Sequence, residues 1–390
     1  EKGDVVKVGQ KIGEAKATIS APVHASVSGT VLEIKEITTV AGFKTKAVVI
    51  ENDGRNELGY EEKNDDYTLL SAEEIISRVR EAGVVGLGGA GFPTSVKLQT
   101  HPGEKIEEII INGAECEPFL TSDQVSMETY PEKVVTGCLI AMQAMEAAKG
   151  YIGIEDNKPN AIDAVKNACA NVPNVEVAVL KTKYPQGDQK RIVQAITNKV
   201  IPSGVHGTAI GVQVFNASTA IAITDAVVYG KPLYEKVVTM TGSAITLPKN
   251  IRVKLGTPLI EMLEFCNGFK EEPGKIIVGG PMMGESQFSV VSPSVKTMGG
   301  VIVLNKEQAQ EKPVSPCIKC GKCVHICPVG LEPLFLQSYS LNGLLEEAEK
   351  NHIMECIECG TCSYVCPANR PLVESIKNGK RLIRATQKAR

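Results

Sequence analysis

Residues 317–328 read Cys-Ile-Lys-Cys-Gly-Lys-Cys-Val-His-Ile-Cys-Pro, and residues 356–367 read Cys-Ile-Glu-Cys-Gly-Thr-Cys-Ser-Tyr-Val-Cys-Pro. Both stretches follow one pattern: two residues separate the first three cysteines, three residues precede the fourth, and proline follows. This spacing is typical of loops that hold [4Fe–4S] clusters. Structural zinc sites instead use paired cysteines separated by a long gap. The sequence therefore predicts two cubane clusters and a C-terminal domain that transfers single electrons.

The fourth cysteine of such a run usually binds the other cluster of the pair, because it lies too far around the first cubane to reach it. We therefore assign two ligand sets, each of which takes its fourth cysteine from the other motif. The first set is Cys317, Cys320, Cys323 and Cys366, and the second set is Cys356, Cys359, Cys362 and Cys327.

The two cysteine motifs carry opposite charges. The first contains Lys319, Lys322 and His325, whereas Glu355 and Glu358 lie at the second. Nearby positive charge stabilises a reduced, more negative cluster and raises its reduction potential. From the local charges alone we expect the first-motif cluster to have the higher potential.

Composition excludes several classes of protein. The net charge of −3 over 390 residues argues against a nucleic-acid partner. Eight of the twelve cysteines belong to the two motifs and the others are scattered, which is typical of a reducing compartment rather than of a disulfide scaffold. The most apolar stretch, residues 134–148, contains polar residues and is too short to span a bilayer, so we expect no transmembrane helix and no signal peptide.

Hydrophobic patterning divides the chain into four expected domains of a multidomain α/β and β fold. Residues 1–62 alternate short β-rich runs with glycine and proline turns, and this pattern resembles the barrel-sandwich fold of lipoyl carriers. Residues 70–230 alternate helices and strands, as in α/β domains. Residues 231–305 are compatible with a β-grasp domain, and residues 306–390 with a helical two-cluster domain. The elements expected are helices at 71–81, 131–149, 258–265 and 343–350, strands at 106–111, 175–180 and 211–215, and a tight turn at 279–284.

A glycine-rich stretch, Gly86-Leu-Gly88-Gly89-Ala-Gly91, precedes Phe-Pro-Thr-Ser-Val-Lys97. It satisfies G-x-G-x-x-G, but a helical stretch precedes it where a dinucleotide fingerprint requires a strand. Glycines let backbone N–H groups approach a phosphate, the proline can start a helix, and Lys97 adds positive charge. We interpret the stretch as a phosphate cradle of another topology. The alternative is a turn whose glycines serve packing.

Four motifs, in order, resemble the subunit of respiratory complex I that oxidises NADH. They are residues 86–97, 112–118, 184–189 and 213–219. The resemblance implies that FMN, held without a covalent bond, is surrounded by Gly86, Gly88, Gly89, Gly91, Lys97, Asn112, Glu115, Tyr184, Gly187, Asp188, Asn216 and Thr219. It also implies that Phe92 and Glu117 face the nicotinamide nucleotide. Hydride transfer between NADH and a flavin requires no dedicated acid–base residue, so we name none.

The order of domains over nearly the whole chain resembles the C subunit of the Rnf complex, a membrane-bound NAD–ferredoxin oxidoreductase. This resemblance implies an oxidoreductase subunit of a translocase. It would pass electrons between NADH, FMN and two [4Fe–4S] clusters. Its partners would be other subunits, including a second iron–sulfur protein. It would lie on the cytoplasmic face of the membrane, held there by its partners.

Two alternatives remain open at this point. A corrinoid reductase shares the architecture. The chain could also be a non-enzymatic iron–sulfur wire or scaffold, because it departs from the complex I pattern in the α/β domain. Gln189 replaces an acid, and Ile201, Pro202 and Ser203 stand where an aromatic would clamp adenine.

The cysteine pattern makes a direct analytical prediction. Anaerobically reconstituted protein should contain about eight iron atoms and eight acid-labile sulfides per chain, because two cubanes require them. Iron and sulfide assays with metal analysis measure this. Stoichiometric zinc without iron would contradict the cluster assignment.

Overall fold

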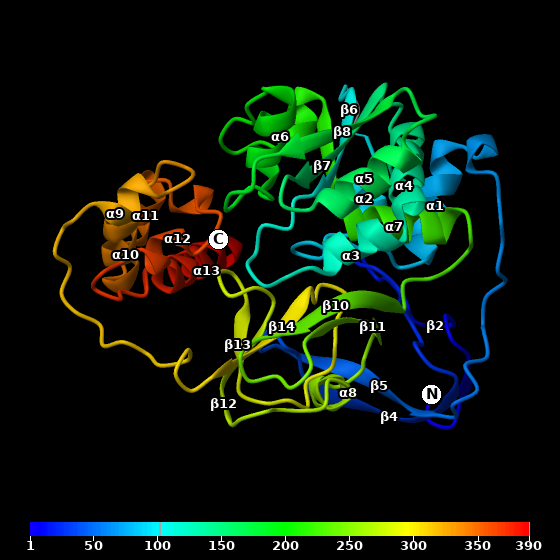
Figure 1. Cartoon of the computed structure of the whole chain (residues 1–390), viewed down its shortest axis with the longest axis horizontal. Coiled ribbons are helices and arrows are strands. Elements are labelled where there is room, and N and C mark those ends of the chain that lie inside the picture. The colour runs from blue at the N-terminus through cyan, green and yellow to red at the C-terminus, as the bar shows by residue number, and fades with distance from the viewer. Residues whose placement is uncertain (101–102, 390) are drawn as a thin grey trace.

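The computed structural model describes residues 1–100 and 103–389, and Figure 1 shows them arranged as four modules. The first module is a small β structure. Its strands are β1 (Val5–Val6), β2 (Lys11–Gly13), β3 (Val23–His24), β4 (Gly29–Thr38) and β5 (Lys44–Asn52). One sheet has the order β1-β4-β5 and the other pairs β2 with β3. Val6, Ala25 and Val31 form its core.

The second module is an α/β domain built on a parallel sheet of order β8-β7-β6-β9. Its strands are β6 (Glu108–Gly113), β7 (Lys149–Glu155), β8 (Val175–Leu180) and β9 (Val212–Asn216). Its helices are α1 (Ala72–Glu81), α2 (Thr94–Lys97), α3 (Ser122–Thr129), α4 (Pro131–Ala144), α5 (Pro159–Ala168), α6 (Gln189–Thr197) and α7 (Ala217–Val227), with short 3-10 turns η1 (Tyr67–Leu69) and η2 (Gly207–Ile210). Ile109 and Ile111 pack into one core and Ile110 into the other, so β6 is buried on both faces.

Several expectations for this domain are confirmed and one is wrong. Ser71 forms the predicted capping box with Glu74, and β8 spans the predicted residues 175–180. The helix expected at 131–149 ends at Ala144, and β7, which sequence reasoning missed, starts at Lys149. Glu146 has a φ of 53°, a left-handed conformation that a helix cannot contain. The chain turns there and enters the sheet.

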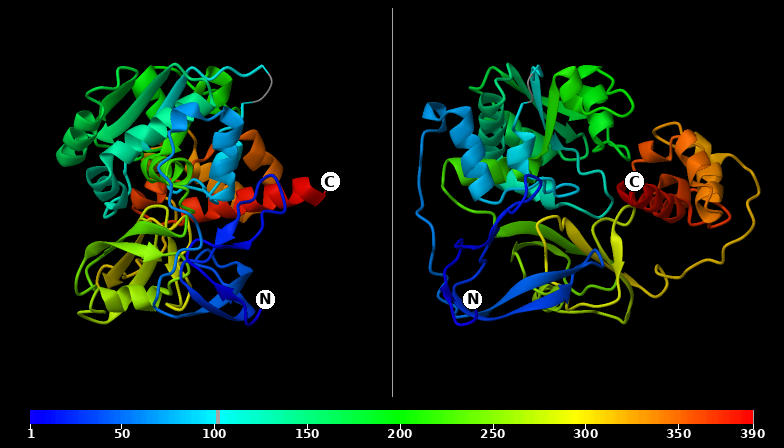
Figure 2. Two further views of the ribbon diagram at one scale, coloured as in Figure 1. Left: turned by 90° about the vertical axis from the view of Figure 1, so that its right-hand side faces the viewer. Right: turned by 180° about the vertical axis from the view of Figure 1, so that it is seen from behind.

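The third module is a five-stranded sheet of order β11-β10-β14-β12-β13. Its elements are β10 (Glu235–Thr241), β11 (Lys249–Lys254), α8 (Leu259–Phe265), β12 (Pro273–Val278), β13 (Glu285–Gln287) and β14 (Gly300–Asn305). The turn expected at 279–284 connects β12 to β13. The module lies beside the first module, and both lie below the α/β domain in the views of Figures 1 and 2.

Lys296 ties these three modules together. Its Nζ donates hydrogen bonds to the carbonyl of Pro22 at 2.9 Å and to that of Gly83 at 2.6 Å. Burial lowers the pKa of Lys296 to about 8. Since Gly83 lies three residues before the glycine-rich stretch begins at Gly86, this contact holds the chain that leads into that stretch.

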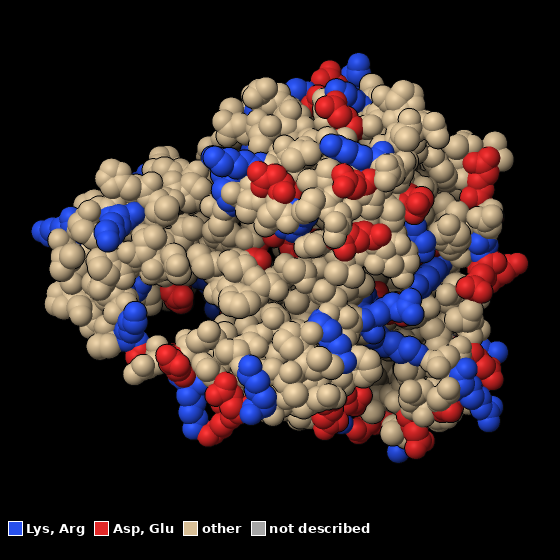
Figure 3. All heavy atoms as spheres, viewed as in Figure 1, with Lys and Arg blue, Asp and Glu red and all other residues tan. Residues whose placement is uncertain are grey.

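The fourth module follows a long connection from β14 and lies to one side of the others (Figures 1 and 2). Its elements are α9 (Lys322–His325), α10 (Pro333–Leu341), α11 (Leu345–Lys350), η3 (Ile353–Glu355), α12 (Thr361–Tyr364) and α13 (Leu372–Ala389). Helix α13 lies on the side that faces the rest of the molecule. Within the described residues, no helix combines the length and apolar character that crossing a membrane requires. Acidic and basic side chains are interspersed over the face drawn in Figure 3.

Gly137 in α4 tests the packing of the α/β core. A Cβ atom at this position would lie 2.1 Å from the carbonyl oxygen of Ala220 in α7. Alanine favours a helix by about 1 kcal/mol over glycine, but collision with backbone in a packed core costs about 1–3 kcal/mol. We expect Gly137→Ala to lower the free energy of unfolding, measured by urea denaturation. Glu132→Ala, on an exposed position of the same helix, should change it by less than about 0.5 kcal/mol. A stabilised Gly137→Ala variant would contradict this packing.

Candidate functional site

The expected cofactor residues gather at one edge of the parallel sheet. Because all four strands run in the same direction, their carboxyl ends meet there, which is where ligands of open α/β sheets bind. Asn112 lies next to the end of β6, and Asn216 ends β9. Tyr184 and Gly187 follow β8. Sequence segments far apart in the chain are thereby brought to one place.

The glycine-rich stretch forms a loop held at both ends. Gly86 N donates to Phe92 O at 2.9 Å, and Leu87 N donates to Thr219 Oγ1 at 2.9 Å, which anchors the loop to the start of α7. A Cβ on Gly88 would lie 2.6 Å from Asn216 Nδ2, whereas a Cβ on Gly89 would meet no atom within 4 Å. The loop therefore packs on one side and presents exposed backbone on the other.

Lys97 lies at the end of α2, directly after the loop. Its Nζ donates to the carbonyl of Val214 in β9 and lies 5.0 Å from the centre of the Phe215 ring. Burial lowers its pKa to about 8. Among the described residues no carboxylate forms an ion pair with Lys97. A buried cation without a counterion is suited to an anionic ligand.

Loops from β6 and β8 hold each other at the sheet edge. Asn112 Nδ2 donates to Gly187 O at 2.8 Å, and Gly187 N contacts Cys116 Sγ at 3.4 Å. A Cβ on Gly187 would lie 2.5 Å from Ala114 O, so this position requires glycine for the close approach. Asp188 accepts hydrogen bonds from the first backbone N–H groups of α6 and so serves as its N-cap.

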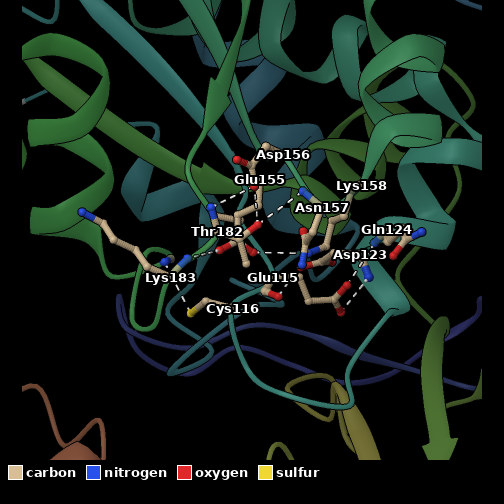
Figure 4. Close-up of polar contacts among 12 residues, drawn as sticks. Glu115, Cys116, Asp123, Gln124, Glu155, Asp156, Asn157, Lys158, Thr182 and Lys183 are labelled. Carbon is tan, nitrogen blue, oxygen red and sulfur yellow. Dashed lines mark hydrogen bonds and ion pairs between the residues drawn. The ribbon is translucent and has the colours of Figure 1, made fainter.

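Glu115 caps helix α3, as Figure 4 shows. Its carboxylate accepts hydrogen bonds from Ser122 Oγ at 3.0 Å, Asp123 N at 3.0 Å and Gln124 N at 3.1 Å. Burial, together with the charge of Asp123, raises the pKa of Glu115 to about 7. This carboxyl group therefore holds its proton more readily than an exposed glutamate does.

Glu117 points the other way, toward the third module. Its Oε2 accepts a hydrogen bond from Met282 N at 3.2 Å, and burial raises the pKa of its carboxyl group. Its Oε1 is buried and has no hydrogen-bond partner within residues 1–100 and 103–389. A buried polar atom without a partner is costly unless a ligand or water satisfies it. This atom therefore fits a site that takes a hydrogen-bond donor.

Sequence reasoning missed a buried ion pair below these loops. Lys158 Nζ lies 3.2 Å from Glu155 Oε2, and their side chains are 5% and 1% exposed. The same ammonium contacts Asn157 Oδ1 at 3.0 Å and Glu115 O at 3.4 Å (Figure 4). The pair thus supports the backbone at Glu115. The sequence gives no sign of it, because the residues that form β7 continue the apolar pattern of the preceding helix.

A second missed residue is Asp123, which joins α3 to α7. Its carboxylate accepts hydrogen bonds from Asn216 Nδ2 at 2.6 Å and Ser218 Oγ at 2.5 Å. Lys236 of β10 faces this carboxylate, which counters the fall of the lysine pKa to about 8 caused by burial. The third module therefore supplies part of the wall around the glycine-rich loop. Sequence motifs give no sign of Lys236, because its partner lies in another domain.

The cysteines fall into two groups in space. Cys327, Cys356, Cys359 and Cys362 line one cavity, together with Val373 and Ile376 of α13. Cys323 and Cys366 pack beside Leu372 and Val373, while Cys317 and Cys320 are exposed. The cavity combines three cysteines of the second motif with the fourth of the first, the grouping that exchange of the fourth cysteine requires. No group of three or more cysteine, histidine or acidic side chains among the described residues is already arranged to hold a metal ion, so the shared cavity supports the grouping of these cysteines but not a formed ligand set.

The second cysteine motif contacts the sheet edge directly. Tyr184 Oη donates to the carbonyl of Cys359 at 2.7 Å. A Cβ on Gly360 would lie 2.5 Å from Met282 O, next to Glu117. These contacts join the candidate flavin loops to a cluster loop without an intervening segment.

A further pair of contacts holds the same motif against α6. Glu355 Oε2 lies 3.0 Å from Lys190 Nζ, and Glu355 Oε1 accepts from Ser203 Oγ at 2.6 Å. A cavity of about 410 Å³ opens beside this contact, with Tyr184, Arg191 and Pro328 in its lining. It lies between the α/β domain and the cluster domain.

Four family models match the chain in order. They are the RnfC barrel sandwich hybrid domain at residues 1–55, the Nuo51 FMN-binding domain at 79–225, the SLBB domain at 237–286 and the 4Fe-4S dicluster domain at 316–370. The expected order of barrel-sandwich, FMN-binding, β-grasp and two-cluster folds is confirmed.

Characterised relatives, all of them C subunits of their complexes, match over most of the chain. The relative from the Na(+)-translocating ferredoxin:NAD(+) oxidoreductase complex of Acetobacterium woodii is 45% identical, covering 100% of this chain and 88% of the relative. The relative from the proton-translocating ferredoxin:NAD(+) oxidoreductase complex of Clostridium ljungdahlii is 43% identical, and the match covers 89% of this chain and 76% of the relative. In the relative from the ion-translocating oxidoreductase complex of Serratia proteamaculans, at 39% identity, the match covers 87% of this chain and 48% of the longer relative.

A solved structure shows the same fold at low identity. An NAD+-reducing [NiFe]-hydrogenase superposes with a TM-score of 0.55 at 17% identity, covering 82% of this chain and 62% of that chain. The family models and the relatives agree with the site geometry: an FMN-binding domain joined to a 4Fe-4S dicluster domain with eight cysteines. The chain belongs to the RnfC family, the C subunits of ferredoxin:NAD+ oxidoreductase complexes.

Proposed function

We propose that this chain carries electrons between a nicotinamide nucleotide at the sheet edge and a partner protein at the first cysteine motif, with the second motif between them. The observation that carries this order is the hydrogen bond from Tyr184 to the carbonyl of Cys359. It brings the second cysteine motif against the candidate flavin site, whereas the first motif approaches that site through Pro328, the last residue of the motif, in the lining of the cavity beside Tyr184. Cys317 and Cys320 are exposed, so a partner protein could approach the first motif.

FMN would be held by backbone of the loop from Gly86 to Gly91 and by side chains around it. The remaining residues of the proposed set are Lys97, Asn112, Glu115, Tyr184, Gly187, Asp188, Asn216 and Thr219. The exposed backbone at Gly89 supports an anionic group there, as does the Lys97 ammonium, which donates to a carbonyl but forms no ion pair with any described residue. When bound, FMN would exchange a hydride with the nicotinamide and single electrons with the clusters, which NADH alone cannot do.

The nicotinamide nucleotide would lie against Phe92 and Glu117. Phe92 is 41% exposed and offers a ring for stacking in a chain with few aromatic residues. The unpartnered Oε1 of Glu117 supports a hydrogen bond from the nucleotide. The departures at Gln189 and at residues 201–203 leave the adenosine half with a different support from that of complex I.

The clusters would be held by the two exchanged ligand sets. Cys356, Cys359, Cys362 and Cys327 would hold the inner one, which the shared cavity supports. Cys317, Cys320, Cys323 and Cys366 would hold the outer one, which the packing of Cys323 beside Cys366 supports.

The partners would be other subunits of a membrane-bound complex, including a second iron–sulfur protein. This proposal rests on the relatives, which are C subunits of Na(+)- and proton-translocating ferredoxin:NAD(+) oxidoreductase complexes, and on the exposure of Cys317 and Cys320 in the first motif. The chain would then lie on the cytoplasmic face of the membrane, held by its partners.

Gly89→Val tests the flavin site. Valine would project from exposed backbone without meeting the protein, so the fold should persist while access of a phosphate to the loop is blocked. We expect FMN affinity, measured by fluorescence titration, to fall at least about tenfold, equivalent to about 1.4 kcal/mol. Gly89→Ala should lose less FMN affinity than Gly89→Val. The thermal unfolding temperature of both variants should match that of the wild type.

Full FMN retention in Gly89→Val would show that the loop is structural. A second experiment uses wild-type protein from which FMN has been removed. NADH should bleach its cluster absorbance only after FMN is restored. Bleaching at an equal rate without FMN would overturn the proposed order. If protein purified under mild conditions shows cluster absorbance without flavin peaks, the result would favour the alternative in which the chain is a non-enzymatic iron–sulfur electron carrier.

Tyr184→Phe tests the contact between the flavin site and the inner cluster loop. The ring remains, but the hydrogen bond to the Cys359 carbonyl is lost. Such a bond contributes about 1 kcal/mol, so the fraction of molecules in which the flavin site and the cysteine loop are in contact should change roughly fivefold relative to the separated form. We expect NADH to bleach the flavin at the wild-type rate and the clusters severalfold more slowly in stopped-flow absorbance. Tyr364→Phe, at an exposed ring of the cluster domain, is the matched control. If the clusters of Tyr184→Phe are bleached at the wild-type rate, the contact between Tyr184 and Cys359 does not contribute to electron transfer from the flavin to the clusters.

A further inference from the structure

One face of α13 covers the cavity of the second cysteine motif. Val373 and Ile376 line the cavity, and Lys380 follows one turn later on the same face. Leu372, Val373, Ile376 and Ile383 of this helix are buried and apolar. Lys380 is therefore a cation within an apolar stripe, and its side chain is only 6% exposed.

The ammonium of Lys380 contacts the cysteine loop itself. Its Nζ donates to the carbonyl of Cys356 at 2.6 Å and pairs with Glu358 Oε1 at 2.6 Å. The neighbouring Gly379 brings the helix close, since a Cβ there would lie 2.3 Å from Ser340 Oγ. The lysine is thus fixed next to a cavity-lining cysteine.

The two members of this ion pair are screened to different degrees. The Glu358 side chain is 28% exposed, whereas that of Lys380 is 6% exposed. Water weakens the field of a charge that it reaches far more than that of a buried charge. The net field at the cavity is therefore positive, although the pair is formally neutral.

The charges near the two motifs differ from those that the sequence suggests. Lys319 and Lys322 of the first motif are exposed and His325 is exposed beside them, so solvent screens all three. At the second motif, Glu355 is paired with Lys190 and Glu358 with Lys380. The acidic character read from that motif is therefore compensated by lysines distant in the sequence. The basis for expecting the higher potential at the first motif is gone.

We propose that Lys380 raises the reduction potential of the cluster held by Cys327, Cys356, Cys359 and Cys362, and that it acts through the loop at Cys356 as a positioning residue. The inference rests on the proposed ligand sets. Reduction adds one negative charge to the cluster, and a fixed, buried ammonium stabilises the reduced form more than the oxidised form. Exposed lysines at the other motif have a weaker effect.

A purely structural role explains the site less well. An apolar side chain would complete the stripe of α13 without the cost of burying a charge. Methionine has a stem similar in length to that of lysine and should fill the same space. The structural role and the electrostatic role therefore predict different behaviour for Lys380→Met.

The test is a redox titration followed by EPR on the full chain with both clusters present. We expect Lys380→Met to shift one of the two midpoint potentials to more negative values. At a fixed potential, the ratio of reduced to oxidised cluster should fall about tenfold, which corresponds to a shift of about 59 mV. Lys380→Arg should retain most of the wild-type value. Lys377→Met is the matched control, since this lysine lies one turn away and pairs with Glu285 at 3.6 Å. It should leave both midpoints unchanged.

Glu358→Gln provides a test of opposite sign that keeps the lysine. It removes the compensating carboxylate, so the same midpoint should move to more positive values. Equal midpoints in wild type, Lys380→Met and Glu358→Gln, with about eight iron atoms in each as two cubanes require, would overturn the inference. If Lys380→Met does not assemble clusters, the midpoint of Glu358→Gln alone tests the inference: a shift to more positive values supports it and an unchanged value overturns it.

Cys356→Ser separates this inference from the proposed function. It should alter the EPR signal of one cluster only, and that signal should belong to the midpoint that moves in Lys380→Met. If Cys356→Ser alters both signals or neither, the ligand sets are wrong. If it alters one signal whose midpoint Lys380→Met leaves in place, the ligand sets stand and the role of Lys380 does not.

Discussion

The hydrogen bond between Tyr184 and the carbonyl of Cys359 is the contact on which the architecture depends. It joins the carboxyl edge of a parallel sheet to a cysteine loop from a module that is attached by a long connection. Gly360 and Met282 pack beside it so closely that a Cβ at position 360 has no room. Together with the ion pair between Glu355 and Lys190, this junction fixes the distance between the two cofactor-binding domains, which the connection after β14 alone does not.

Buried charge gives the sheet edge its rigidity and its chemistry. Lys158 and Glu155 are almost fully buried and paired, and the ammonium also reaches the backbone at Glu115. Breaking such a pair by removing one partner typically costs about 3–5 kcal/mol, since the other charge stays buried. Lys97 differs, because the described residues offer it only a carbonyl and an aromatic ring. One lysine is therefore used to hold the loops, and the other remains available to an anion.

The sequence predicts local features well and contacts between domains poorly. The capping box at Ser71 and strand β8 follow from residues that are neighbours in the chain, so spacing alone reveals them. The helix expected at 131–149 is too long, because apolar residues on both sides of Glu146 continue the pattern up to β7 and the left-handed turn at Glu146 has no glycine to signal it. The cysteine motifs indicate both clusters. Their electrostatic surroundings cannot be read from the motifs, because Lys190 and Lys380 approach them from other elements.

The charge around a redox centre is therefore a property of the fold rather than of the motif. The second motif is acidic in sequence, yet Glu355 and Glu358 each meet a lysine from a different helix, and the lysine of α13 is the more deeply buried partner. A charge pair whose members differ in exposure does not cancel at a buried point, because solvent screens the exposed member more strongly. The contacts that dock the cluster domain and close its helix over the cavity thus also determine the field at the inner cysteine loop. Lys190 compensates the second motif from across the domain junction, whereas Lys380 compensates it from within the cluster domain.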